Sequence, residues 1–191
     1  LSLDYPLILD FNENSEKIIS VSVNGKSEPI RHEKEHLIIA SNNLLEGRNK
    51  IEVQFVAGDL SLNRNDDFLY TLLVPDRAST LFPCFDQPAL KATFTLTVTT
   101  PGHWEAVSNN PVESKVAKGD LVEWKFSTTP RIATYLDALI AGPYSSVHDV
   151  YKGQKEIPLG IYCRKSMMQY LDPEDIFLIT KQGFEYFEKT F

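Results

Sequence analysis

The residues with the clearest capacity for chemistry form the string His32-Glu33-Lys34-Glu35-His36, which satisfies the pattern H-E-x-x-H. On a helix, two histidines four residues apart bind one zinc ion, and the glutamate acts as a general base on the metal-bound water. This string lies instead between two strand-like runs, 21–24 and 37–40. Extended chain would place the two histidines about 13 Å apart, and no helical segment downstream presents a third ligand. We therefore interpret His32, Glu33 and His36 as a chance match in a hairpin loop and predict no metal site there.

The other histidines and the two cysteines do not form a catalytic pattern. His103 and His148 are isolated in the sequence. Cys84 and Cys163 lie in apolar surroundings without a C-x-x-C spacing, so we expect buried thiols rather than a disulfide or a metal pair. The chain also lacks the G-x-S-x-G, P-loop and G-x-G-x-x-G patterns. Residue types alone therefore predict no catalytic centre.

A second candidate site is the proline-rich segment 75–92. Pro83 and Pro88 fix φ on both sides of Cys84–Gln87 and restrict the residue before each proline. A backbone held in this way can present its side chains accurately, and Asp86 and Gln87 are the polar residues that it would present. A stiff connection between two strands would also explain the prolines. Both interpretations stay open at this point.

Strands must position these segments, because most of the chain has a hydrophobic period of two. In 92–100, apolar residues alternate with threonines, and Asn24-Gly25 favours a tight hairpin turn after 19–23. The further strand-like runs are 37–40, 51–55, 68–74, 104–107, 121–126, 135–141, 145–150 and 157–163. About ten or more short strands predict a mainly β fold, a large antiparallel twisted β-sandwich or saddle, followed by a C-terminal α-helix.

The pattern changes near Ser166. Asp172-Pro173-Glu174-Asp175 is a helix-start signature, with a capping carboxylate, a proline in the first turn and acids near the positive end of the helix dipole. We predict an apolar helix face formed by Ile176, Ile179, Gly183, Phe184 and Phe187, with Lys181, Glu185 and Glu188 on the opposite side. Residues 1–165 would then form a β domain, and residues 166–191 would begin another domain.

Composition restricts the classes of function. The 191 residues carry a formal charge of −7, which disfavours nucleic acid as a partner. The apolar runs are far shorter than the roughly 20 residues that span a bilayer, so we expect no membrane span. Neither end resembles a natural terminus, so we expect a piece of a longer protein. Localisation is unknown from this stretch of sequence.

Several segments together resemble the aminopeptidase N family of zinc metallopeptidases. Phe82–Pro88, followed by Leu90-Lys91-Ala92, is similar to the family's F-P-C-F-D-E-P-x-x-K-A-x-F segment. Val107-Ser108-Asn109, the stretch Thr134–Gly142 and Val23-Asn24-Gly25 resemble further family elements in the same order. The resemblance covers roughly residues 19 to 165 and is specific as a combination.

The resemblance implies an N-terminal β domain packed against a catalytic domain of the same chain, in an enzyme that removes N-terminal residues from peptides. The family's G-x-M-E-N segment and its zinc helix are absent from these 191 residues. We therefore expect zinc in the parent enzyme and no cofactor, catalytic residue or activity in this piece. Its expected role is to wall and gate the substrate cleft, with the catalytic domain and peptide substrates as partners.

The resemblance also indicates candidate residues at the cleft or the domain interface. Relatives place a Gln or Glu that binds the substrate amine eight residues before the motif, where this chain has Val74. A valine cannot accept a hydrogen bond from an amine, and Asp76 is the nearest acid that could substitute. Asp86 and Gln87, inside the motif, complete the set of candidates.

A different class of protein fits the strand pattern as well. A free-standing β-sandwich that binds carbohydrate or protein would use surface aromatic side chains such as Trp104 and Tyr144. The sequence around Phe82–Pro88 favours the aminopeptidase interpretation over this alternative.

Overall fold

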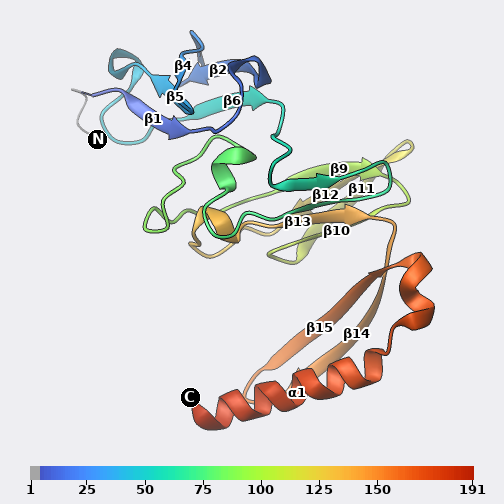
Figure 1. Ribbon diagram of the computed structural model, residues 1–191. Coiled ribbons are helices and arrows are strands. Elements are labelled where there is room, and N and C mark those ends of the chain that lie inside the picture. Colours follow the sequence, from blue (N-terminus) through green and yellow to red (C-terminus); the bar gives the residue numbers. More distant parts are fainter. Residues whose placement is uncertain (1–4) are drawn as a thin grey trace.

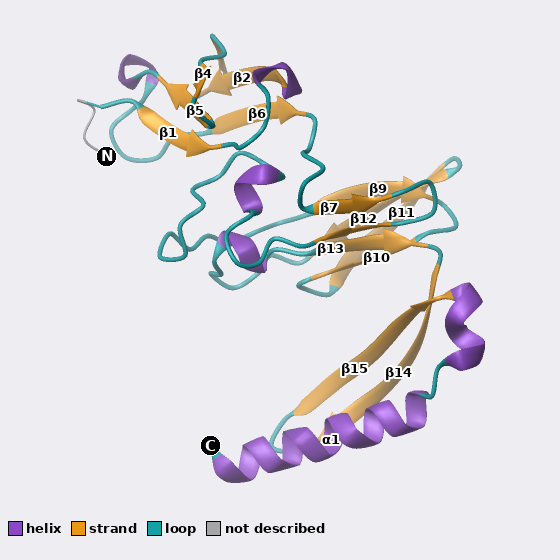
Figure 2. Cartoon of the chain, in the orientation of Figure 1, coloured by secondary structure: helices purple, strands orange, loops and turns teal. Residues whose placement is uncertain are grey.

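A computed structural model describes residues 5–191 and shows several antiparallel sheets and one long helix (Figures 1 and 2). The mainly β prediction is confirmed. Two sheets form a first sandwich, with strand orders β1-β5-β4 and β3-β2-β6. Their bounds are β1 (Leu7–Asp10), β2 (Ile18–Val23), β3 (Lys26–Glu28), β4 (His32–Glu33), β5 (His36–Ile39) and β6 (Ile51–Phe55).

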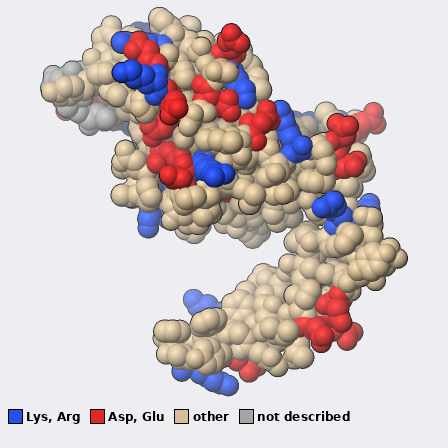
Figure 3. Space-filling model, viewed as in Figure 1, with Lys and Arg blue, Asp and Glu red and all other residues tan. Residues whose placement is uncertain are grey.

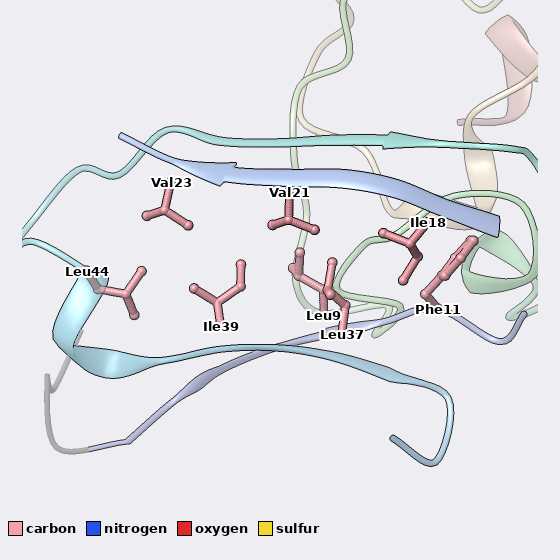
Figure 4. Close-up of a cluster of buried hydrophobic side chains, with 8 residues drawn as sticks. All are labelled: Leu9, Phe11, Ile18, Val21, Val23, Leu37, Ile39 and Leu44. Atoms are coloured by element: carbon pink, nitrogen blue, oxygen red, sulfur yellow. The ribbon is translucent and has the colours of Figure 1, made fainter. Parts of the chain in front are cut away.

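Alternating apolar residues of these strands make the core of the first sandwich. β1 pairs with β5 so that Leu9 lies opposite Leu37, and both side chains are buried. Figure 4 shows side chains of the two sheets pointing toward one another. The buried cluster consists of Leu9, Phe11, Ile18, Val21, Val23, Leu37, Ile39 and Leu44. Burial of these side chains stabilises the sandwich by the hydrophobic effect.

A second sandwich follows in the chain. We call its sheets the β13 sheet, with order β10-β13-β8-β7, and the β12 sheet, with order β11-β12-β9. Their inner faces enclose a core that contains both tryptophans, Trp104 and Trp124. The bounds are β7 (Leu62–Arg64), β8 (Leu69–Thr71), β9 (Thr97–Pro101), β10 (Glu105–Ser108), β11 (Val112–Lys118), β12 (Leu121–Phe126) and β13 (Leu139–Gly142).

A third, small buried cluster lies beneath the proline-rich loop. Leu73, Ala78 and Cys84 form it, and Phe82 and Tyr135 pack against it. Short 3-10 helices surround these sandwiches at Ser15–Lys17, Ser41–Asn43, Ala78–Thr80 and Thr134–Leu136. The small cluster therefore joins the loop to the segment that precedes β13.

The last part of the chain, residues 144–191, forms what we call the arm. It contains a long hairpin of β14 (Tyr144–Lys152) and β15 (Glu156–Arg164), the 3-10 helix Lys165–Tyr170 and the helix α1 (Pro173–Thr190). Figure 1 shows α1 running along the hairpin, away from the two sandwiches. The predicted helix start is confirmed, because the Asp172 carboxylate accepts a hydrogen bond from the Asp175 amide at 3.3 Å.

The predicted faces of α1 were partly wrong. Phe177 is buried against the hairpin, and Phe184 stacks on Tyr151 with ring centroids 5.0 Å apart. Lys181 and Glu188, expected on the opposite side, also face the hairpin. The hairpin supplies polar partners there, because Lys181 pairs with Asp149 and Glu188 accepts a hydrogen bond from the Tyr151 hydroxyl.

The remaining apolar side chains of α1 are uncovered. Ile176, Ile179 and Phe187, which the sequence placed on the apolar face, are exposed. Within residues 5–191, no helix combines the length and the apolar character needed to cross a membrane.

Candidate functional site

The H-E-x-x-H string forms a tight β-hairpin, as predicted. Its residues lie in β4, a two-residue turn and β5, and the turn residues Lys34 and Glu35 have φ values of 48° and 68°. The Nε2 atom of His32 lies 2.9 Å from the Phe11 carbonyl oxygen. No three side chains of residues 5–191 gather in a way that could hold a metal ion.

The proline-rich loop is attached to the first sandwich through Asp10. The Asp10 amide donates to the Cys84 carbonyl at 2.7 Å, and the Cys84 amide donates back at 3.0 Å. The Asp10 carboxylate accepts a further hydrogen bond from the Asp86 amide at 2.9 Å and lies 3.1 Å from Nδ1 of His36. The end of β1 therefore fixes the backbone of the loop between its two prolines.

Asp86 fixes the same loop from its other side. One carboxylate oxygen accepts the Ser79 amide and the other accepts the Thr134 hydroxyl, each at 2.8 Å. Its carboxylate thus ties the loop to Ser79, seven residues earlier in the chain, and to Thr134, 48 residues later. Both carboxylate oxygens are occupied by structural partners.

Three of the four sequence-predicted candidates line one pocket of about 300 Å³. The pocket lies between the end of β1, the β4–β5 hairpin and the loop. Its lining residues are Asp10, Asn12, Glu35, His36, Asp76, Ser79, Asp86 and Gln87. Four of these are carboxylates, and among the described lining residues there is no lysine or arginine. Such a set can hydrogen-bond polar or cationic groups. Its hydroxyl, on Ser79, and its imidazole, on His36, are not hydrogen-bonded to each other in the described part of the chain.

Val74, the fourth candidate, lies outside this pocket. It is 65% exposed at a turn that the Arg77 amide closes by donating to the Leu73 carbonyl at 2.8 Å. Asp76 follows in the same turn and is exposed, and from the described residues its carboxylate receives no hydrogen bond. The structure therefore separates Val74 from Asp76, Asp86 and Gln87.

Cys84 lies beside the pocket as a free, buried thiol. Burial, with smaller contributions from the charges of Asp86 and Asp10, raises its pKa above the ordinary range. A thiol held in its neutral form is a poor nucleophile. Cys163, also a free thiol, is only half-buried.

Sequence reasoning missed Asp10, Glu35, His36 and Thr134 as neighbours of the loop. No local pattern could have found the first three, because they come from strands more than 40 residues before the loop. The expectation that Trp104 is a surface aromatic was also wrong. Its side chain is only 9% exposed because it fills the core of the second sandwich, which weakens the alternative of a carbohydrate-binding face.

Comparison with known proteins agrees with the motif resemblance. Residues 8–136 match the family described as Peptidase M1 N-terminal domain. Aminopeptidase N of Streptomyces lividans is 44% identical over 165 residues, which cover 80% of this chain and 19% of that protein. Human aminopeptidase Q is 34% identical over 128 residues, which cover 64% of this chain and 13% of that protein. The chain therefore spans a fifth or less of the length of these two relatives.

Solved structures show the same fold. Aminopeptidase A of Legionella pneumophila has a TM-score of 0.75 at 18% identity, over 87% of this chain and 21% of that one. An M1 zinc metallopeptidase of Deinococcus radiodurans has a TM-score of 0.64 at 18% identity, over 85% of this chain and 41% of that one. Together with the family match over residues 8–136, these findings show that the chain belongs to the Peptidase M1 N-terminal domain family.

Proposed function

We propose that this chain is the non-catalytic N-terminal domain of a zinc-dependent aminopeptidase, and that it walls and gates the cleft in which peptides lose their N-terminal residues. The observation that carries the proposal is the loop Phe82–Pro88. Asp10 and the Asp86 carboxylate hold this loop from two sides, and Asp76, Asp86 and Gln87 line a polar pocket beside it.

The catalytic groups and the zinc ion of the proposed enzyme belong to a part of the protein beyond these residues. The relatives named aminopeptidases are at least five times as long as the matched segment, which leaves room for such a domain. Residues 166–191 would begin that domain, and the division at 165/166 stays a prediction. The exposed apolar residues of α1, Ile176, Ile179 and Phe187, would be covered by it.

Within the proposed enzyme, Asp86 is a positioning residue because both carboxylate oxygens bond to the protein. Gln87 is neutral and cannot act as an acid or base, but its amide can contact a peptide or the facing domain. Val74 supplies no acceptor for a substrate amine. If the amine contact is made from this domain, Asp76 is the candidate whose carboxylate receives no hydrogen bond from residues 5–191.

The test compares the whole protein with residues 1–191. We expect the whole protein to hydrolyse aminoacyl-4-nitroanilides and to contain stoichiometric zinc by atomic absorption. Residues 1–191, shown to be folded by a β-type circular dichroism spectrum, should do neither. Zinc bound by the short chain and lost in the His32→Ala/His36→Ala variant would contradict the proposal, as would a whole protein without peptidase activity.

A further inference from the structure

The two sheets of the second sandwich differ on their outer faces. On the β12 sheet most outward positions are polar, because Thr99 lies opposite Glu123 and Thr97 lies opposite Lys125. Val116 and Leu121 are the apolar exceptions on this face, at 48% and 46% exposure. Lys125 forms an ion pair with Glu113 at 2.9 Å. Apolar residues point inward and mainly polar residues point outward, which is the pattern of a sheet with one face in water.

The outer face of the β13 sheet is more apolar, although Glu105 in β10 and Asn63 in β7 also point outward. Ala106, Ala141 and Leu69 point into the core, so their neighbours in the alternating strands point outward. Among these neighbours, Val107 lies opposite Ile140, and Ile140 lies opposite Tyr70. A row of apolar and aromatic side chains therefore crosses three adjacent strands on the outside of the sandwich.

The apolar row continues beyond the end of β8. Leu73 is buried, whereas Leu72 and Val74 on either side of it are 56% and 65% exposed. Leu136, before β13, is 46% exposed. We call this surface the outer apolar face, and it consists of Tyr70, Leu72, Val74, Val107, Leu136 and Ile140. Figure 3 shows charged side chains of both signs over the first sandwich and fewer along the lower edge of the second sandwich.

The arm packs against the edge of this face. Phe68 stacks on Tyr70 with ring centroids 6.1 Å apart, and the guanidinium group of Arg164, at the end of β15, lies 4.8 Å from the centre of the Phe68 ring. Gly142 is packed against Phe68 and Tyr144 so closely that a Cβ atom would lie 2.8 Å and 2.9 Å from their side-chain atoms. The contact between the arm and this face is therefore close.

We propose that the outer apolar face is the surface on which the catalytic domain of the same chain packs, continuing the contact that the arm begins at Phe68. The proposal rests on the proposed function for the existence of that domain. Contiguous apolar patches on the surface of a soluble protein mark interaction sites, and a face with aromatic residues and few charges is typical of the buried centre of an interface.

The length of the relatives supports this occupant over a second copy of the chain. The matched segment is only 19% of the Streptomyces lividans protein, so most of the polypeptide of such an enzyme lies outside it. The arm contacts Phe68, which stacks on Tyr70 at the edge of the outer apolar face. A covering domain in the same chain needs no association between molecules.

The test measures the accessibility of introduced thiols in the full-length protein. Leu72→Cys places a thiol on the outer apolar face, and Ile19→Cys places one on the first sandwich at nearly equal exposure, 56% against 54%. Leu136→Cys and Val116→Cys form a second pair, at 46% and 48%, in case the first fails to fold. Alkylation by N-ethylmaleimide is followed for each peptide by mass spectrometry.

We expect the thiols at positions 72 and 136 to react at least tenfold more slowly than those at 19 and 116. Equal rates within each pair would overturn the proposal. Protection that disappears on dilution, with a matching change from dimer to monomer in ultracentrifugation, would assign the face to a second copy and would also overturn it. These outcomes do not depend on peptidase activity, so the proposed function can fail separately through the activity and zinc measurements.

Discussion

The β12 sheet and the β13 sheet enclose the same core, yet their outer faces differ in chemistry. The β12 sheet exposes threonines and an ion pair, whereas the β13 sheet exposes Val107, Ile140 and Tyr70 in one row. The inner faces explain why the sandwich folds. The outer faces reflect what we propose surrounds the sandwich, with water on one side and protein on the other.

The candidate loop lies at the end of the more apolar of the two sheets. Leu73, directly after β8, packs in the small cluster with Cys84, so the loop is anchored at the end of the apolar sheet. Asp10 ties the same loop to the first sandwich. A domain that packed on the outer apolar face would therefore lie next to Val74 and Asp76, and the loop would border the space between the two domains.

The core shared by the two sheets should show the largest effect. Trp124 is 3% exposed, and its indole N–H donates to the Thr100 hydroxyl at 2.9 Å. We expect Trp124→Ala to lower the free energy of unfolding of residues 1–191 by about 4 kcal/mol, from lost burial and a cavity. Urea unfolding followed by circular dichroism measures it, with Thr99→Ala as the control. A loss below about 1 kcal/mol would show that the two inner faces do not share a tight core.

The outer faces should respond differently to an added charge in the full-length protein. Ile140→Asp would bury a carboxylate without a partner, and we expect a loss of about 3 kcal/mol. Thr99→Asp, on the outer face of the β12 sheet, should change stability by less than about 0.5 kcal/mol. Thermal unfolding of the two variants provides the comparison. Equal changes would mean that both faces meet the same surroundings.

The strands that could be predicted from the sequence are those with one face in the core and the other in water. The strands Leu121–Phe126 and Ile51–Phe55 were predicted with their observed bounds, because apolar and polar residues alternate in them. β11 (Val112–Lys118) was missed because every residue in it is exposed, so it carries no hydrophobic period. In 68–74 apolar residues occur at both inward and outward positions, so the sequence predicted a longer strand there than the observed β8, Leu69–Thr71.

The candidate site likewise contains residues that the sequence predicted and residues that it could not predict. Asp76, Asp86 and Gln87 were identified from one continuous segment and do line one pocket. Asp10, which fixes the loop, could not be predicted because its role depends on a backbone pairing with Cys84 across the fold. Ala92–Thr100 was expected as one strand, but the structure has β9 only from Thr97, with an isolated bridge from Ala92 to Ile132 before it.

Substitutions in the loop at the end of the β13 sheet should separate a structural role from a functional one. Asp86→Ala leaves the Ser79 amide and the Thr134 hydroxyl without their acceptor, so we expect residues 1–191 to lose about 1–3 kcal/mol of stability. Gln87→Ala should leave the melting temperature nearly unchanged. In the full-length enzyme it should lower kcat/KM by about tenfold or less, equivalent to about 1.4 kcal/mol. Equal destabilisation by both changes would show that the loop has only a structural role.

We expect the smallest change in stability at the outer face of the β12 sheet. Lys125→Ala removes the ion pair with Glu113, in which both side chains are about half exposed. We expect a change of less than about 0.5 kcal/mol, because exposed ion pairs contribute little. A double-mutant cycle with Glu113→Ala isolates the pair. A coupling energy above about 1 kcal/mol would indicate that this face is covered in the full-length protein.

The central claim, that protein covers the outer face of the β13 sheet and water covers that of the β12 sheet, can be tested most directly without any substitution. Hydroxyl-radical footprinting of the full-length protein, read by mass spectrometry, reports the solvent exposure of individual side chains. The account predicts that Leu72 and Leu136 are oxidised far more slowly than Ile19 and Val116, which match them in exposure within residues 5–191. Similar oxidation rates for the two pairs would contradict it.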